Sequence, residues 1–155
     1  MNTNEETALD ACRSMIRAAS LLRRELERVF AGSGLSGPQF GILCQLDADG
    51  SMPLSELGNR LWVSWANVTG LVDKLAAAGY VRRIRLRRDR RVVLAELTEK
   101  GRDAISELRP LHRDCLMRFT AGLDVTEMRR LQSILEKLTR PCKEEPRRAG
   151  KPGGN

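Results

Sequence analysis

Five consecutive charged residues, Arg87-Arg88-Asp89-Arg90-Arg91, are the side chains with the clearest chemical potential in the sequence. Guanidinium groups bind phosphate oxygens through fixed pairs of N–H donors, and an arginine inserted in a narrow minor groove responds to its negative potential. An aspartate two residues before an arginine can pair with that guanidinium and aim it. The run is therefore predicted to contact a polyanion, with a solvated basic hairpin as the competing interpretation.

The stretches on either side of these charges are rich in β-branched and apolar residues, which predicts a β-hairpin over Val81–Arg85 and Val92–Leu97. Two short helical patterns precede it, Leu54–Leu61 and Ser64–Leu75, with the tight turn Trp62-Val63 between them. Two short helices this close in sequence must cross steeply, as in a helix-turn-helix. The order of these elements predicts a winged helix-turn-helix.

The second of these helices carries the candidate base-reading residues, because a helix fits the major groove and presents its N-terminal residues to base edges. Asn67 can pair with adenine or a phosphate through its amide, and Trp65 can pack on a thymine methyl or a sugar. Alternatively, Ser64 is only a helix cap and Trp65 is a core or interface residue. The predicted DNA contacts of this helix are Ser64, Trp65, Asn67, Val68, Thr69 and Lys74.

Composition agrees with a helical, nucleic-acid-binding domain. The 155 residues are enough for one domain with a core, and aromatic residues make up only 4%, which favours helices packed by aliphatic side chains. The net charge of +7 favours a polyanionic partner, because clustered lysines and arginines release the counterions of phosphates.

The sequence offers no constellation for catalysis or metal binding. A nucleophile elbow, a phosphate loop and paired acid and base groups are missing, so we expect no enzymatic activity and no cofactor. His112 is the single histidine, and the cysteines Cys12, Cys44, Cys115 and Cys142 have no C-x-x-C spacing, which predicts free thiols and no metal site. The N-terminus does not resemble a signal peptide and no apolar run reaches membrane-spanning length, which favours a cytoplasmic protein without a membrane partner.

Amphipathic periodicity predicts four further helices around this unit, and Ser36 with Gln39 and Asp124 with Glu127 form the capping signatures of two of them. The four helices cover residues 7–30, 36–46, 98–119 and 123–138. Pro110 is expected to kink or break the third of them. Because the first helix is longer than one small core needs, we expect the flanking helices to pack across a two-fold axis as a dimerisation bundle.

These elements predict a mainly α fold with a small β-wing. Residues 1–140 form one domain with the helix-turn-helix at 53–78, the wing at 81–97 and dimerisation helices at 7–30 and 98–139. Residues 141–155 are rich in Pro, Gly, Lys and Arg and are expected to be a flexible basic tail, since they hold too little apolar surface to fold alone.

Two segments resemble the MarR family of winged helix-turn-helix transcriptional regulators. Leu97-Thr98-Glu99-Lys100-Gly101, preceded by Asp89-Arg90-Arg91, looks like the family's signature, and residues 63–81 resemble its recognition helix and exit. The resemblance implies a homodimer on a pseudo-palindromic operator, often a repressor released by a small aromatic or phenolic ligand or by thiol oxidation. It also implies that Arg91 enters the minor groove, that Asp89 aims it, and that Arg87, Arg88 and Arg90 neutralise phosphates.

The same resemblance implies an effector pocket where the dimerisation helices meet the DNA-binding lobe. Its candidate lining residues are Cys12, Met15, Ile16, Leu43, Cys44, His112 and Arg113. Thiol sensing by Cys12 is a second possible mode of control; the only tyrosine, Tyr80, lies in the other lobe, whereas the peroxide-sensing branch uses tyrosines near its cysteine. A winged helix used for protein contacts and a nonspecific architectural DNA binder are two competing functions for the same pattern.

Overall fold

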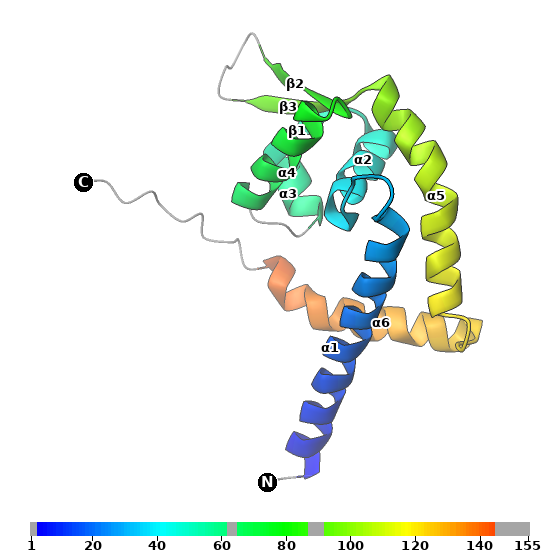
Figure 1. The fold of residues 1–155 in the computed structure, drawn as a ribbon. Helices are drawn as coiled ribbons and strands as arrows, with labels where there is room; N and C mark the ends of the chain where they lie inside the picture. The colour runs from blue at the N-terminus through cyan, green and yellow to red at the C-terminus, as the bar shows by residue number, and fades with distance from the viewer. Residues whose placement is uncertain (1–2, 62–64, 87–91, 145–155) are drawn as a thin grey trace. The chain divides into compact units, whose positions relative to one another are not determined.

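The computed structural model describes residues 3–61, 65–86 and 92–144, with the backbone alone at 65–66 and 141–144. The chain divides into two compact units, residues 1–118 and 119–155. The elements are α1 (Thr3–Phe30), α2 (Gly37–Asp49), β1 (Met52–Pro53), α3 (Leu54–Leu61), α4 (Trp65–Ala77), β2 (Val81–Arg85), β3 (Val93–Leu97), α5 (Glu99–Phe119) and α6 (Val125–Glu144) (Figure 1). This mainly helical architecture with one small sheet confirms the predicted fold class.

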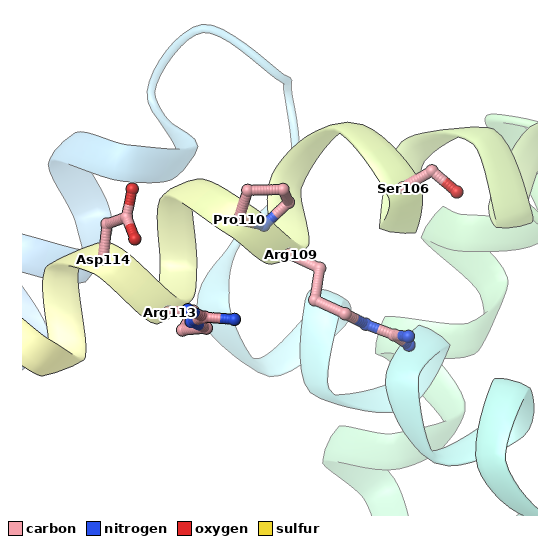
Figure 2. A pocket seen from close by; sticks show the side chains of 5 residues that line it. All are labelled: Ser106, Arg109, Pro110, Arg113 and Asp114. Atoms are coloured by element: carbon pink, nitrogen blue, oxygen red, sulfur yellow. The ribbon is translucent and has the colours of Figure 1, made fainter.

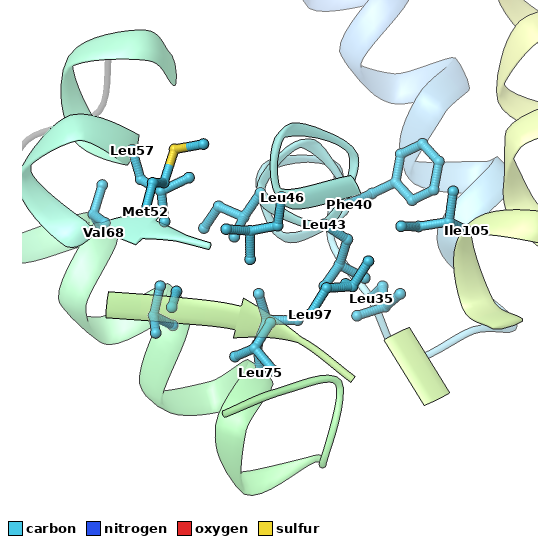
Figure 3. Packing of buried hydrophobic residues seen from close by; sticks show 14 of the residues in the cluster. Leu35, Phe40, Leu43, Leu46, Met52, Leu57, Val68, Leu75, Leu97 and Ile105 are labelled. Atoms are coloured by element: carbon cyan, nitrogen blue, oxygen red, sulfur yellow. The ribbon is translucent and has the colours of Figure 1, made fainter. Parts of the chain in front are cut away.

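The hydrophobic core of the first unit gathers apolar side chains from α2, α3, α4, the sheet and the start of α5 (Figure 3). Its largest fully buried side chains are Ile42, Leu43, Leu54, Leu57, Val68, Val72 and Leu75. Leu97 of β3 and Ile105 of α5 close it on one side. Helices α3 and α4 present their buried apolar residues at intervals of three or four, so one stripe of each is removed from water.

The sheet has three antiparallel strands in the order β1-β3-β2, one strand more than the sequence predicted. Met52 and Pro53 pair with Ala95 and Leu94, so the short segment before α3 is hydrogen-bonded to the hairpin. Pro53 is tolerated because β1 lies at the sheet edge, where one side of the strand needs no ladder partner.

Reciprocal caps begin α2 and α6, as the sequence predicted. The backbone N–H of Ser36 donates to Gln39 Oε1 at 2.8 Å, and the N–H of Gln39 donates to Ser36 Oγ at 3.4 Å. The N–H of Asp124 donates to Glu127 Oε2 at 2.9 Å, and that of Glu127 donates to Asp124 Oδ1 at 2.8 Å. Each box satisfies two of the backbone donors that a helix start leaves unpaired.

Thr98 joins the end of α4, the start of β2 and the start of α5. Its hydroxyl lies within donating distance of the carbonyl oxygens of Gly79 (2.7 Å) and Tyr80 (2.9 Å), and it accepts from the N–H of Gly101 at 3.1 Å. Lys100 donates to the carbonyl oxygen of Ala78 at 2.7 Å, and its ammonium lies 4.7 Å from the centre of the Tyr80 ring. The Leu97–Gly101 segment is therefore a structural joint.

Several helices are longer than expected: α1 begins at Thr3 rather than Thr7, and α2 ends at Asp49 rather than Leu46. The break expected at Pro110 is absent, because α5 continues from Glu99 to Phe119. Proline removes one N–H bond, and burial of Leu108 and Cys115 on either side holds the helix together. The last helix extends to Glu144 rather than Leu138, so residues 141–144 of the predicted tail are helical, and residues 145–155 lie outside the described residues.

Both long terminal helices expose apolar side chains within the unit to which each belongs. Residues 3–21 of α1 are all exposed, and only its last turns, around Leu26, Val29 and Phe30, pack on the core. In the second unit α6 exposes Val125, Leu131, Ile134, Leu135 and Leu138. The last four recur at spacings of three, one and three residues, which is one stripe along the helix.

Candidate nucleic-acid interface

Helix α4 divides into a buried face and an exposed face. Val68, Val72 and Leu75 are completely buried, which fixes α4 on the core. This corrects the prediction that Val68 contacts DNA, because its side chain has no accessible surface. Asn67 and Lys74 are exposed and lie two turns apart, so they share the face directed away from the core.

Of the other residues in this segment predicted to contact DNA, Thr69 has a described side chain, whereas Ser64 and Trp65 do not. Thr69 is half-buried, and between Asn67 and Lys74 the exposed face continues through Gly70. A Cβ at Gly70 would meet nothing within 4 Å, so this part of the helix is open to an approaching groove. Ser64 and the side chain of Trp65 lie outside the described residues.

The β2–β3 hairpin packs beside α4 (Figure 1). Its ladder pairs Val81 with Leu97 at one end and Arg85 with Val93 at the other. One further bond, from the N–H of Leu86 to the carbonyl oxygen of Val92 at 3.3 Å, extends the ladder toward the predicted wing. The wing residues Arg87, Arg88, Asp89, Arg90 and Arg91 lie outside the described residues.

Three arginines on β2 were not among the DNA contacts predicted from the sequence. Arg82 forms an ion pair with Glu96, the residue directly opposite it on β3, and this pair lowers the pKa of the Glu96 carboxyl. Arg83 forms an ion pair with Asp73 of α4, whereas the next arginine, Arg85, is exposed. The signal that could have found them is the two-residue alternation of a strand, which separates Arg82 from Arg83 and Arg85.

A second feature is a cavity of about 530 Å³ along α5, lined by Ser106, Arg109, Pro110, Arg113 and Asp114. Figure 2 shows Arg109 extending from α5 toward α2, where its guanidinium contacts Asp47 at 2.6 Å. The second guanidinium of the lining belongs to Arg113, which lies on α5 with the apolar ring of Pro110.

The thiol of Cys44 lies beside the same arginine. Partial burial raises the pKa of Cys44, and the Arg109 guanidinium offsets part of that effect. A raised pKa reduces the thiolate fraction and therefore the reactivity of the thiol. Cys115 is buried and Cys12 is exposed, and both are free thiols.

The histidine belongs to an aromatic cluster at the junction of α1, α2 and α5. The ring of His112 lies 6.1 Å from Phe30 and 5.3 Å from Phe40, and the two phenyl rings are 5.1 Å apart. Burial lowers the pKa of the His112 imidazole, because the charged form loses hydration there. A neutral His112 acts as a third aromatic ring.

The predicted effector residues lie in different surroundings in the first unit. Arg113 lines the α5 cavity, and Cys44 lies beside Arg109. Leu43 is fully buried in the core, which corrects its assignment to a pocket wall. Within the same unit Cys12, Met15 and Ile16 lie on the exposed part of α1.

Neither membrane insertion nor a metal centre is indicated in the described part of the chain. None of its helices combines the length and the apolar content that crossing a bilayer requires. No three His, Cys, Asp or Glu side chains converge there as metal ligands.

Sequence comparisons match this chain to known regulators. The family model described as MarR family matches residues 35–93, which include α2, both helices of the helix-turn-helix and most of the hairpin. The uncharacterized HTH-type transcriptional regulator YkoM of Bacillus subtilis is 30% identical over 132 residues, covering 85% of this chain and 86% of that protein. The transcriptional repressor MprA of Escherichia coli is 31% identical over 121 residues, covering 77% and 69%.

Solved structures of DNA-binding regulators are also similar to this chain. Sco3205, a MarR family transcriptional regulator from Streptomyces coelicolor in complex with DNA, has a TM-score of 0.85 at 25% identity and covers 98% of this chain and 95% of that one. BpsR of Bordetella bronchiseptica, whose DNA binding is regulated by 6-hydroxynicotinic acid, has a TM-score of 0.78 at 25% identity, with 84% and 98% covered.

Proposed function

Because this chain belongs to the MarR family of transcriptional regulators, we propose that it is a sequence-specific repressor that binds a pseudo-palindromic operator as a homodimer. The observation that carries the proposal is the exposed face of α4, with Asn67 and Lys74 beside the hairpin that leads to the arginine-rich wing. A helix of this kind enters the major groove, while an adjacent wing reaches the minor groove. As a DNA-bound regulator the protein acts in the cytoplasm.

The proposed dimer is supported by apolar surface that each unit leaves exposed. On α1 these side chains include Leu9, Met15, Ile16 and Leu21, and on α6 they include Ile134 and Leu138. Apolar patches of this kind mark interaction surfaces, and a second copy of the chain is the commonest partner. Two recognition helices about one DNA turn apart would then match a two-fold symmetric operator.

Binding is tested by fluorescence anisotropy with labelled DNA from upstream of the protein's own coding sequence. A specific regulator holds this DNA against an excess of unrelated DNA, and its affinity falls as salt increases. Equal affinity for both DNAs would indicate an architectural binder. Absence of binding to either DNA would favour a winged helix used for protein contacts.

The dimer is tested by substituting the apolar stripe of α6. Ile134→Glu should shift the protein toward monomer in sedimentation experiments and weaken operator binding. Ser133→Glu is the matched control, because it adds the same charge to the opposite side of the helix. If both variants remain dimeric, the stripe on α6 does not form the interface.

We further propose that a small aromatic ligand with an acidic group releases the protein from DNA. The support is the α5 cavity, in which Arg113 can meet a carboxylate or phenolate beside Arg109, whose guanidinium pairs with Asp47. Aromatic carboxylates should lower operator affinity, while the corresponding neutral amides should not. Arg113→Gln should abolish the response, whereas Arg102→Gln, an exposed arginine on α5 outside the cavity lining, should retain it.

A further inference from the structure

Strand β2 carries three arginines within five residues, and two of them are held by carboxylates with different roles. Arg82 pairs with Glu96 across the hairpin, so this ion pair lies within one element. Arg83 pairs with Asp73, so this ion pair joins the hairpin to α4. The two pairs have the same chemistry and are both partly exposed, but they differ in what they connect.

The position of Arg83 explains why it reaches the helix. It follows buried Val81 on the same face of β2, and that face packs against α4. Asp73 directly follows Val72 and precedes Leu75 by two residues, so it is flanked by side chains that anchor α4 in the core. The contact between β2 and α4 is therefore hydrophobic on its inner side, and the Arg83–Asp73 ion pair lies at its exposed outer edge.

We propose that the Arg83–Asp73 ion pair is a positioning contact that holds the wing hairpin at a fixed orientation to the recognition helix. Helix and wing then meet the major groove and the neighbouring minor groove as one body. The inference rests on the proposed DNA-binding function. Arg83 itself is occupied by Asp73, which leaves Arg85, one step nearer the wing, to contact a phosphate.

The physical reason is preorganisation. Two recognition elements that move independently must each be ordered when they bind, and this lowers affinity for the site that requires both. Both members of the pair are partly exposed, and exposed ion pairs contribute little to fold stability. Loss of the pair should therefore be detected in operator binding more clearly than in unfolding.

An electrostatic role and a positioning role of Asp73 predict opposite changes in operator affinity for the substitution Asp73→Asn. Asp73→Asn removes a negative charge from the recognition helix, so a purely electrostatic effect would tighten binding to the DNA polyanion. Loss of positioning would weaken binding to the operator. Glu96→Gln is the matched control, because it removes the same charge from a carboxylate that also pairs with an arginine of β2.

The test compares operator and unrelated DNA for the parent protein, Asp73→Asn and Glu96→Gln at fixed salt. We expect Asp73→Asn to lose about tenfold in operator affinity, within the range of couplings measured for contacting residues. It should bind unrelated DNA at least as tightly as the parent. Glu96→Gln should bind both DNAs at least as tightly as the parent. Operator binding by Asp73→Asn equal to or tighter than that of Glu96→Gln would overturn the proposal.

Two further measurements keep the result interpretable. Arg83→Gln removes the other partner, so the double variant with Asp73→Asn should discriminate between the DNAs no worse than Arg83→Gln alone; additive losses would contradict a shared contact. Thermal unfolding verifies that each variant is folded.

A DNA-free measurement separates this inference from the proposed function. Spin labels at Gly70→Cys and Leu86→Cys, in a protein without its native cysteines and diluted with unlabelled chains, report the distance from α4 to the hairpin. Asp73→Asn should broaden the distance distribution, and Glu96→Gln should leave it unchanged. Unchanged distributions in both would refute the positioning contact. A parent protein that fails to prefer operator DNA would refute the proposed function instead.

Discussion

A Cβ atom at Gly101 would lie less than 3.0 Å from the carbonyl oxygen of Tyr80, closer than real Cβ atoms approach an oxygen. It would also lie 2.6 Å from Leu97 Cδ1. The same carbonyl accepts from the N–H of Thr98 at 3.1 Å and cannot retreat without losing that bond. The glycine of the family signature is therefore required by the close packing of α5 on the strand start, and its role is structural.

Gly101→Ala should lower the free energy of unfolding by about 2–3 kcal/mol, because overpacking beside backbone forces the structure to shift. Chemical denaturation measures the change. Gly70→Ala is the control, since its Cβ would meet nothing within 4 Å. It should stabilise the fold by about 0.5–1 kcal/mol through its higher helix propensity. Equal stability of parent and Gly101→Ala would show that the joint can relax.

His112 makes stability depend on pH. Burial lowers its pKa in the folded state, so the unfolded chain takes up a proton first as the pH falls. Stability is therefore full above about pH 6.5 and decreases as the pH falls through the folded-state pKa. His112→Phe keeps a ring against Phe30 and Phe40 and should remove this part of the pH dependence. Identical pH profiles of parent and variant between pH 5 and 7, in roughly the range where histidine titrates, would contradict the assignment.

The wing arginines remain a prediction from sequence. Arg91→Ala should weaken operator binding by about 1–3 kcal/mol, the usual effect of losing a groove-inserted arginine. Arg88→Ala should instead reduce the slope of log affinity against log salt, because it removes one phosphate contact. Anisotropy titrations at several salt concentrations separate the two effects. Unchanged affinity for Arg91→Ala would remove it from the interface.

The thiols are expected to leave DNA binding insensitive to peroxide. Cys12 is exposed, yet the chain's one tyrosine is Tyr80, which packs at the α4–β2–α5 joint. Operator affinity measured before and after peroxide should agree. Release that dithiothreitol reverses, and that disappears in Cys12→Ser, would establish the thiol mechanism instead.

Alkylation rates provide a separate test of the cysteine environments. Cys44 should react slowly with iodoacetamide, because burial raises its pKa. Arg109→Ala should slow it further, since the guanidinium is what offsets the burial. Mass spectrometry of the Cys44 peptide over time reports the rate. Faster alkylation at unchanged stability would mean that Arg109 shields the thiol rather than stabilising the thiolate.

Local signals in the sequence determined much of this protein. The apolar spacing of Leu54, Leu57 and Leu61, the reciprocal caps at Ser36 and Asp124, and the strand runs around the arginines predicted elements that the structure confirms. These features depend on residues at most a few positions apart. Backbone hydrogen bonding and side-chain periodicity therefore specify them without knowledge of the fold.

Contacts between distant segments were decided only by the tertiary structure. The pairing of β1 with β3 and the ion pair from Arg83 to Asp73 join residues whose proximity no spacing rule encodes, and the complete burial of Val68 and Leu43 depends on the same packing. The sequence determined that this chain carries a helix-turn-helix and a basic hairpin. Only the tertiary structure shows which face of α4 is exposed to solvent and which arginines of β2 form ion pairs, because both depend on how the elements pack on the core.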